Sequence, residues 1–220
     1  YRLFGTLDLH THIRLREVMH FFQDYLDQFS NIRILELGCG SGVNAFEIYK
    51  IACKKNTHLN YTGVDLSFEE IKTANSFLQT FLNMKAEISF YQEDAINFLK
   101  RHKDLKERAD IILMADIIEH IKDPQKLISF SAEYLKNNGF FVVSVPTPLY
   151  PKIFGRKFHN KIGHLRDGYS LDQLDELFYS VGCRRIMYKY NTGILSNVGC
   201  WLYYNKLNFN NGYINLLKQF

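Results

Sequence analysis

The chain has 220 residues, of which 46% are hydrophobic and 23% are charged, proportions that are ordinary for a globular protein. No apolar run approaches the ~20 residues that a membrane-spanning helix requires, so we expect no transmembrane segment. The net charge of +4 comes from 27 basic and 23 acidic residues that form no long block, which does not indicate a nucleic-acid partner.

Hydrophobic residues recur at helical spacing near the start of the chain and in short runs further on. Leu15, Val18, Phe22 and Leu26 share one helical face, which predicts an amphipathic helix over about 11–29. Short apolar runs then predict buried strands at 33–37, 61–64, 87–91, 110–114 and 140–145. The stretches between them predict helices at 43–53, 68–82, 95–102 and 124–135.

This alternation predicts a doubly wound α/β fold, in which a mostly parallel sheet carries helices on both faces. No low-complexity linker divides the chain, so we expect a single domain over 1–220. In such sheets ligands bind beyond the carboxyl ends of the strands, and the residues that follow each strand are therefore the candidates for a site.

A glycine-rich loop, LELGCGSG at 35–42, follows the first predicted strand. Gly38, Gly40 and Gly42 allow a sharp turn and the close approach of a ligand to the backbone, and the next helix directs free N–H groups at the loop. Val43 stands where the dinucleotide fingerprint needs its third glycine, which counts against NAD. An ordinary tight turn is the alternative interpretation.

The stretch ILELGCGSG resembles the first motif of the class I S-adenosylmethionine-dependent methyltransferases, which has an acidic residue at the place of Glu36. The resemblance extends over about 32–183, most of the chain. It implies that Glu36, Cys39 and the three glycines contact the cofactor, and that the product S-adenosylhomocysteine leaves the same site. It also implies a division into a lid helix (1–30), a cofactor-binding core (31–146) and an acceptor-side loop with C-terminal helices (147–220).

Two carboxylates follow the next strands at the places where this family binds the nucleoside. GVDLS ends the second strand with Asp65, which resembles the ribose-binding residue, and Leu66 follows it. YQEDA ends the third strand with Asp94, similar to the residue that receives the adenine amino group, and Ala95 follows. A carboxylate accepts two donors at once, as a ribose diol requires. Taken singly, Asp65 is also a plausible turn former and Asp94 a plausible helix N-cap.

The segment MADIIEHIKDP at 114–124 follows the fourth strand, where the family places the gap between the methyl donor and the acceptor. The resemblance implies a cofactor contact for Ala115 and a substrate contact for Asp116. On a helical turn Asp116, Glu119 and His120 would share a face. They resemble the acidic-x-x-Glu-His metal motif of ubiquinone-pathway O-methyltransferases and small-RNA 2′-O-methyltransferases, with Asp in place of the usual Glu. The alternative is a metal-independent site in which His120 acts as general base.

The stretch 145–174 is too long for a simple connection, and we expect it to be functional. Its part GHLRDGYSLDQL resembles the His-x-Arg-x-x-x-Ser-x-x-x-Leu segment that closes over the acceptor in the family. The resemblance implies substrate contacts for Tyr169 and, with an anionic group, for Arg166, and a catalytic contact for His164. The alternative is that His164 and Arg166 orient the loop itself. His159 lies in the same stretch, and a helix is expected to begin at Ser170.

Both ends of the chain carry patterns that are open to more than one interpretation. DLHTH at 8–12 resembles a metal-hydrolase motif, but we interpret it as the start of a lid helix whose His10 and His12 reach the acceptor pocket. Aromatic and aliphatic residues predict an amphipathic helix at 194–206, which packs on the domain or contacts a membrane surface. The segment RRIMYKY at 184–190 either supplies one member of the family's final antiparallel strand pair or marks a departure from it.

The four cysteines, at 39, 53, 183 and 200, form no Cys-x-x-Cys pair and no zinc spacing. We therefore expect no disulfide framework and no structural metal. No signal segment is visible in a chain that starts at Tyr1 and that we interpret as trimmed, and a reducing cytoplasm is the expected location.

The resemblance implies an S-adenosylmethionine-dependent methyltransferase. The modest charge and the lid helix favour a small-molecule acceptor, such as a sugar, a lipid-linked compound or a secondary metabolite, methylated on oxygen or nitrogen. Two alternatives remain: an RNA 2′-O-methyltransferase that uses a divalent metal, and a non-catalytic partner subunit that has kept the cofactor pocket.

Overall fold

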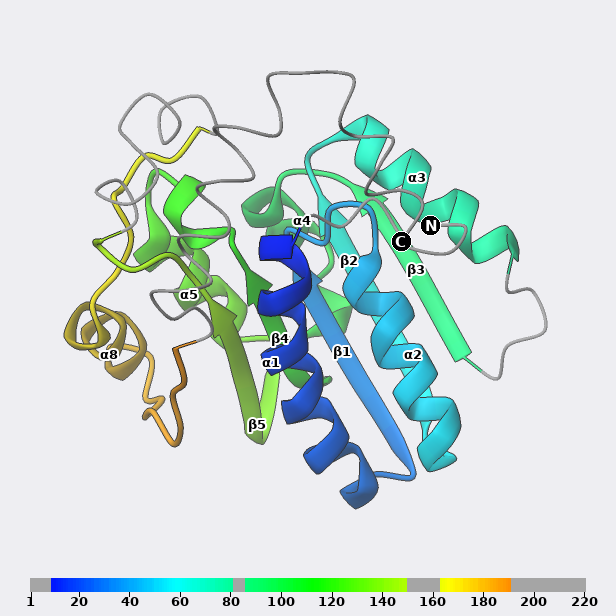
Figure 1. Ribbon diagram of the computed structural model, residues 1–220. Helices are drawn as coiled ribbons and strands as arrows, with labels where there is room; N and C mark the ends of the chain where they lie inside the picture. Colours follow the sequence, from blue (N-terminus) through cyan, green and yellow to red (C-terminus); the bar gives the residue numbers. More distant parts are fainter. Residues whose placement is uncertain (1–8, 81–85, 150–162, 191–220) are drawn as a thin grey trace.

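The computed structural model describes the backbone of residues 9–80, 86–149 and 163–190, and the side chains of all of these except 9–14 and 79–80. Five parallel strands form one sheet in the order β3-β2-β1-β4-β5 (Figure 1). Their bounds are β1 (Asn31–Leu37), β2 (His58–Asp65), β3 (Ala86–Gln92), β4 (Ala109–Ala115) and β5 (Leu135–Ser144). The chain reverses direction across the sheet between β1 and β4, where sheets of this type bind ligands. The predicted doubly wound α/β fold is confirmed.

Helices cover both faces of the sheet (Figure 1). One face packs against α1 (Leu9–Tyr25), the 3-10 turn η1 (Leu26–Gln28) and α2 (Val43–Lys55). The other packs against α4 (Ala95–Arg101), α5 (Pro124–Ala132) and α8 (Leu171–Tyr179). Two further 3-10 turns are η2 (Lys103–Leu105) and η3 (Ile118–His120), and α3 (Phe68–Thr80) joins β2 to β3. None of the helices in the described ranges is long and apolar enough to span a bilayer.

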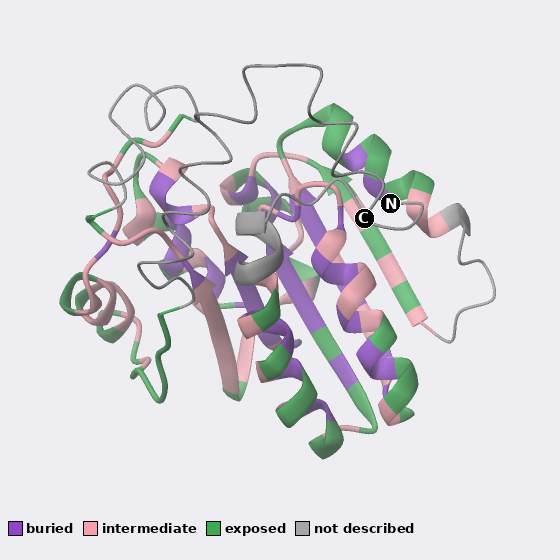
Figure 2. Cartoon of the chain, viewed as in Figure 1, coloured by how far each residue is buried: buried purple, intermediate pink, exposed green. Residues whose placement is uncertain are grey.

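The central strand β1 shows why the sequence forms this sheet. Ile32 and Ile34 contribute to the core beneath α1 and α2, whereas Leu35 and Leu37 contribute to the core beneath α4 and α5. Alternate side chains of a strand point to opposite faces, so a strand that is buried on both faces is apolar almost throughout. Figure 2 shows the result, with buried residues along the central strands and exposed ones on the outer sides of α1 and α2.

The structure differs from the predicted boundaries around β5. A helix was predicted to continue to 135, but α5 ends at Ala132 and Leu135 already pairs with Ala109 of β4. The register then shifts, because Ile111 pairs with Phe140 and leaves the polar residues 136–139 as an irregularity in the strand. Asn138 adopts a left-handed φ of 63° there. An apolar run marks only the regular part of such a strand, which is why 140–145 was predicted.

The segment 184–190 forms no strand with the other described residues, and both interpretations of it stay predictions. Side-chain contacts join this segment to α8 and α1. Arg185 pairs with Asp175 of α8 at 2.8 Å, and Lys189 lies 3.6 Å from Glu17 of α1. The predicted helix at 194–206 lies outside the described residues, as do Asp8 and His159 and the side chains of His10 and His12.

Candidate cofactor and acceptor site

The glycine loop between β1 and α2 has a backbone that only glycine accommodates at two of its positions. Gly38 and Gly42 adopt left-handed φ values of 76° and 75°. A Cβ atom at Gly38 would lie 2.9 Å from Cβ of Ile117, and one at Gly42 would lie 2.8 Å from Cζ of Phe90. A Cβ at Gly40 would meet nothing nearer than a carboxylate oxygen of Glu70 at 3.8 Å, so the crest of the loop borders open space.

Asp65, at the carboxyl end of β2, holds this loop in place. Its Oδ2 accepts a hydrogen bond from the Gly40 amide at 2.8 Å, and its Oδ1 accepts one from the Ser67 amide, also at 2.8 Å. Each carboxylate oxygen can accept a second donor. The turn-forming role is therefore present, and acceptor capacity remains for a ligand beside the loop. Leu66 follows with 69% of its surface exposed.

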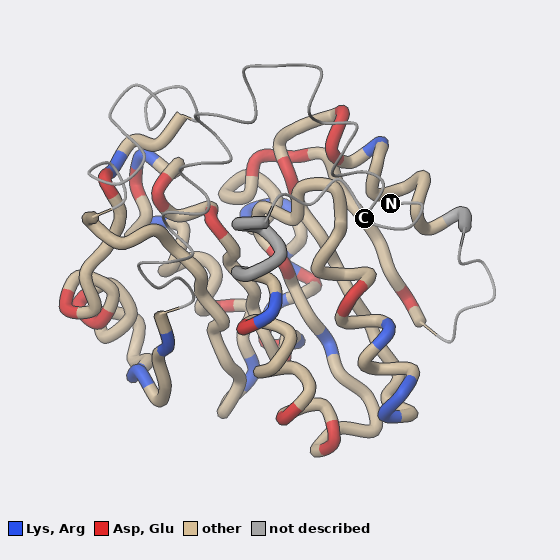
Figure 3. The backbone as a smooth tube through the Cα atoms, in the orientation of Figure 1, with Lys and Arg blue, Asp and Glu red and all other residues tan. Residues whose placement is uncertain are grey.

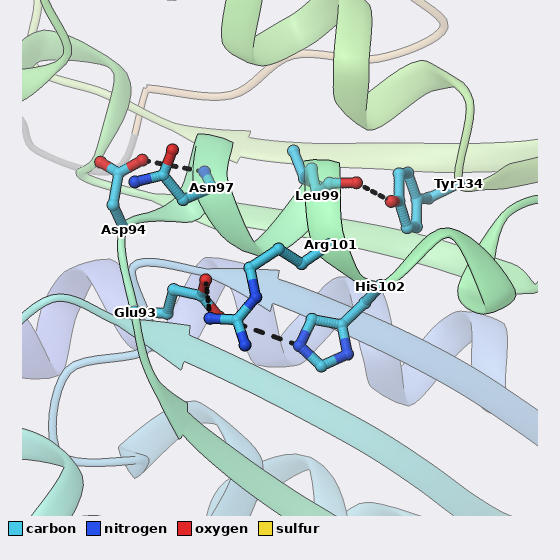
Figure 4. A network of polar contacts seen from close by, with 7 residues as sticks. All are labelled: Glu93, Asp94, Asn97, Leu99, Arg101, His102 and Tyr134. Atoms are coloured by element: carbon cyan, nitrogen blue, oxygen red, sulfur yellow. Dashed lines mark hydrogen bonds and ion pairs between the residues drawn. The ribbon is translucent and has the colours of Figure 1, made fainter.

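Asp94 lies at the end of the neighbouring strand β3 and caps α4 (Figure 4). Its Oδ1 accepts from the Asn97 amide at 3.0 Å, as the N-cap interpretation expects. The adjacent Glu93 donates its amide to the carbonyl of Asp65 at 2.9 Å, and Arg101 in the last turn of α4 binds its carboxylate at 3.0 Å. These bonds hold the loops after β2 and β3 together, so Asp65 and Asp94 lie on adjacent strand ends.

Glu36 is fully buried in β1, next to the glycine loop. Its Oε1 accepts a hydrogen bond from Nδ2 of Asn44 in α2 at 2.5 Å. Burial disfavours the charged carboxylate and raises the pKa of Glu36 to about 8, an effect that the Asn44 bond opposes and the Asp65 charge reinforces. Burial likewise raises the pKa of the Cys39 thiol, which keeps this thiol neutral.

The residues after β4 adopt a different arrangement from the predicted helical turn. Asp116 has a left-handed φ of 52° and donates its amide to the Ser144 carbonyl at 2.8 Å, so it precedes the turn that contains Glu119 and His120. The predicted trio of Asp116, Glu119 and His120 on one helical face is therefore wrong. The left-handed backbone of Asp116 separates it from the turn, and the spacing of the three residues in the sequence does not predict this conformation.

A different trio can offer ligands to a metal ion. One ligand atom each of Glu119, His120 and His164 lies within 4.8 Å of the others. Nε2 of His164 is 3.8 Å from a carboxylate oxygen of the fully buried Glu119, and the rings of His120 and His164 are 4.7 Å apart. Two imidazoles and one carboxylate form a donor set that suits Zn²⁺, Fe²⁺ or Mn²⁺. The acceptor-side segment thus contributes His164 where the sequence interpretation had Asp116.

His120 is oriented by a backbone carbonyl. Its Nδ1 lies 3.1 Å from the oxygen of Gly163. A carbonyl only accepts, so in the neutral ring Nδ1 carries the hydrogen of this bond and Nε2 keeps its lone pair. This tautomer leaves Nε2 able to take a proton or to bind a metal.

Arg166 and Tyr169 fasten their own loop to the segment after β4. The Arg166 guanidinium donates to the carbonyls of Ile121 and, at 2.8 Å, Lys122. The Tyr169 hydroxyl donates to the carbonyl of Ile118 at 3.2 Å, and its side chain is buried. These bonds favour the loop-orienting interpretation of Arg166, and the substrate contacts of both residues stay predictions.

Tyr169→Phe is expected to destabilise the protein by about 1 kcal/mol, because the Ile118 carbonyl loses the hydrogen bond from the buried hydroxyl and keeps only the one from the Ile121 amide at 3.3 Å. Urea unfolding followed by circular dichroism measures this difference. The matched control is Tyr179→Phe, since Tyr179 is 60% exposed and its loss should cost less than about 0.5 kcal/mol. Equal stability of the two variants would contradict the assigned role of the hydroxyl.

Sequence reasoning missed two groups that position the site, Asn44 and the Gly163 carbonyl. Asn44 is a buried polar residue on the apolar side of α2, and that mismatch with the helix pattern was the available signal. The Gly163 carbonyl belongs to the backbone, so no residue type in the sequence indicates its role. A cavity of about 430 Å³ near the amino end of β4, lined in part by Leu99, Phe130 and Tyr134, includes none of the predicted site residues.

Acidic residues surround the loops that follow β2 and β3 (Figure 3). Residues 65–70 and 92–94 contain no Lys or Arg, and their acidic members are Asp65, Glu69, Glu70, Glu93 and Asp94. S-adenosylmethionine carries a sulfonium and an ammonium group, both cationic. The acidic rim, the open crest at Gly40 and the paired strand-end carboxylates fit such a nucleoside.

Comparison with known proteins identifies the family to which this chain is similar. Residues 10–188, most of the chain, match the family described as Methyltransferase domain. Ubiquinone biosynthesis O-methyltransferase of Rickettsia typhi is 25% identical over 142 residues, which cover 64% of this chain and 52% of that protein. The matched region thus spans about half the length of this curated relative.

Solved structures share the fold at low sequence identity. A putative sarcosine dimethylglycine methyltransferase from Galdieria sulphuraria has a TM-score of 0.61 at 16% identity, covering 90% of this chain and 75% of that one. An N-methyltransferase from Haemonchus contortus, in complex with phosphomonomethylethanolamine and S-adenosylhomocysteine, has a TM-score of 0.55 at 20% identity, covering 81% and 43%. Identities this low show the fold alone.

The parallel sheet with a glycine loop after its central strand is that of the Rossmann-like class I S-adenosylmethionine-dependent methyltransferases. The chain belongs to the Methyltransferase domain family of this class. The resemblance stated from the sequence is confirmed at the level of the family, and the roles of individual residues remain predictions.

Proposed function

We propose that this protein transfers the methyl group of S-adenosylmethionine to an oxygen or nitrogen atom of a small molecule. One observation carries the proposal: the glycine loop, Asp65 and Asp94 follow three neighbouring strands. The Gly40 amide donates to the Asp65 carboxylate, and the amide next to Asp94, that of Glu93, donates to the Asp65 carbonyl. A relative named as an O-methyltransferase supports the reaction type.

The strand order predicts how the cofactor lies. Asp94 on β3 takes the adenine, Asp65 on β2 the ribose, and the loop after β1 the amino-acid portion. Ala115 and Asp116 at the end of β4 then border the methyl group. The cofactor supplies an activated methyl carbon, and the protein contributes alignment and exclusion of water.

His120 is the proposed general base for a hydroxyl acceptor. Its Nδ1 is committed to the Gly163 carbonyl, so Nε2 accepts the proton that the hydroxyl loses as the methyl group is transferred. The buried carboxylate of Glu119 and the ring of His164 lie beside it, and they stabilise the imidazolium that forms. His10 and His12, at the start of α1, are proposed to reach the acceptor as part of a lid.

A metal-assisted version of the same reaction is the second candidate, favoured by the Glu119, His120 and His164 trio. A divalent ion there would lower the pKa of a bound hydroxyl. Such a metal site also suits an RNA 2′-hydroxyl as the acceptor. The remaining alternative is a subunit that binds the cofactor and does not catalyse methyl transfer. A cytoplasmic location and peripheral membrane contact also stay predictions.

The test is transfer of label from methyl-labelled S-adenosylmethionine to a panel of phenols, catechols, sugars and amines, with an RNA oligonucleotide as the competing acceptor. Each reaction is run with EDTA and with Mg²⁺, Mn²⁺ or Zn²⁺. Transfer to a small molecule supports the proposal, and loss of that transfer in EDTA assigns the metal. Exclusive labelling of RNA, or firm cofactor binding without any transfer, would contradict it.

A further inference from the structure

Glu36 and Asn44 form a buried amide–carboxylate pair beside the cofactor loop. The pair is joined by one bond of 2.5 Å, from Asn44 Nδ2 to Glu36 Oε1. Among the described residues, neither Glu36 Oε2 nor Asn44 Oδ1 has a hydrogen-bond partner, although both atoms are buried. Buried acceptors are nearly always paired, so two such atoms side by side indicate a place where a donor arrives.

Among the described residues, no cation compensates the buried carboxyl of Glu36. The charged and titratable groups that act on it or on its neighbour Cys39 are Asp65 at the end of β2, the Cys39 thiol itself and Glu70 in α3. All of them are acidic, and Glu36 forms no ion pair with another described residue. Burial without a cation favours the protonated carboxyl, and the pKa of about 8 agrees with this.

The strand order identifies the arriving donor. If Asp94 takes the adenine and Asp65 the ribose, the amino-acid end of the cofactor lies over β1, the next strand, which carries Glu36. Its ammonium group has three N–H donors and a positive charge. It can satisfy both unpaired acceptors and provide the cation that an ionised Glu36 lacks.

We propose that Asn44 is a positioning residue that holds Glu36 to receive the ammonium group of the cofactor, and that cofactor binding releases the proton of Glu36. The proton passes to the solvent, and the ammonium keeps its own three hydrogens. This inference rests on the proposed cofactor site. It adds a proton coupling and a role for Asn44 to that site.

Calorimetric titration of the full chain at pH 7 tests the coupling, with two ligands that differ in the ammonium group. S-adenosylhomocysteine carries it, and 5′-methylthioadenosine lacks the whole amino-acid portion. The titrations are repeated in phosphate and in Tris, whose ionisation enthalpies differ, so that the number of released protons is obtained. We expect close to one proton for S-adenosylhomocysteine, since a group with a pKa of about 8 is mostly protonated at this pH, and none for 5′-methylthioadenosine.

Two variants separate positioning from folding. Asn44→Ala and Glu36→Gln should each reduce the affinity for S-adenosylhomocysteine at least tenfold and leave the affinity for 5′-methylthioadenosine within threefold of the wild type. Binding of S-adenosylhomocysteine to Glu36→Gln should release no proton. The matched control is Asn60→Ala, because Asn60 forms a similar amide–carboxylate bond with Glu87 on an exposed part of the sheet. It should change neither affinity.

Equal proton release with both ligands, or unchanged S-adenosylhomocysteine affinity in Asn44→Ala, would overturn the inference. In either case binding of 5′-methylthioadenosine would still support the nucleoside site. Failure of both ligands to bind the folded wild-type chain would instead contradict the proposed function.

Discussion

Replacement of His120 by glutamine is expected to slow methyl transfer to an oxygen acceptor by about 10²–10⁴-fold, the range that a positioned general base contributes. Glutamine can still donate a hydrogen bond to the Gly163 carbonyl, so the loop contact is preserved. Its amide cannot take a proton as the Nε2 lone pair does. The transfer rate should therefore fall while the affinity for S-adenosylhomocysteine stays within a factor of about two.

The measurement is the single-turnover rate at saturating cofactor, combined with calorimetric affinity for S-adenosylhomocysteine. His20→Gln is the matched control, because His20 lies on the exposed side of α1. If His120→Gln transfers as fast as the wild type, His120 is not the base. A parallel loss of cofactor affinity would place it in the cofactor site instead.

Asp65→Asn is expected to reduce the affinity for S-adenosylhomocysteine by about 100-fold, or about 3 kcal/mol, because charge-assisted hydrogen bonds to two ribose hydroxyls are lost. The same change weakens the bonds that hold the Gly40 and Ser67 amides, so the crest of the loop loses its support. Both effects act on ligand binding beside the loop. Calorimetric titration of the folded variant measures the loss.

Asp110→Asn provides the matched control for Asp65. Asp110 also accepts a backbone amide bond, from Arg33 at 2.8 Å, and it pairs with Lys136 at 2.5 Å. It lies near the start of β4, at the opposite end of the sheet from the glycine loop. Its replacement should reduce stability and leave the affinity unchanged. An Asp65→Asn variant that binds as tightly as Asp110→Asn would remove Asp65 from the site.

The parts of the fold that follow from local patterns were predictable from the sequence. β1 and β4 contain the buried stretches 34–37 and 111–114, which are apolar except for Glu36, and the glycine loop needs residues without a Cβ at Gly38 and Gly42. Family resemblance then placed Asp65 and Asp94 at adjacent strand ends. These features depend on residues close together in the chain or on motifs with fixed spacing.

Features that depend on distant contacts were not predictable. The irregularity at 136–139 in β5 is set by pairing with β4, and polar residues within it hide the start of the strand. The left-handed backbone of Asp116 and the arrival of His164 beside Glu119 require the folded loops. Asn44 pairs with Glu36 eight residues earlier, across a strand and a turn, which no helix or strand period predicts.

The most direct test of a cofactor site on these strand ends is a calorimetric titration of the folded wild-type chain with S-adenosylhomocysteine, in which the heat of binding is measured. The site predicts saturable binding with one nucleoside per chain, competition by S-adenosylmethionine and no competition by NAD. A chain that is folded by circular dichroism and releases no binding heat at any temperature would contradict the assignment of the glycine loop, Asp65 and Asp94 to one nucleoside.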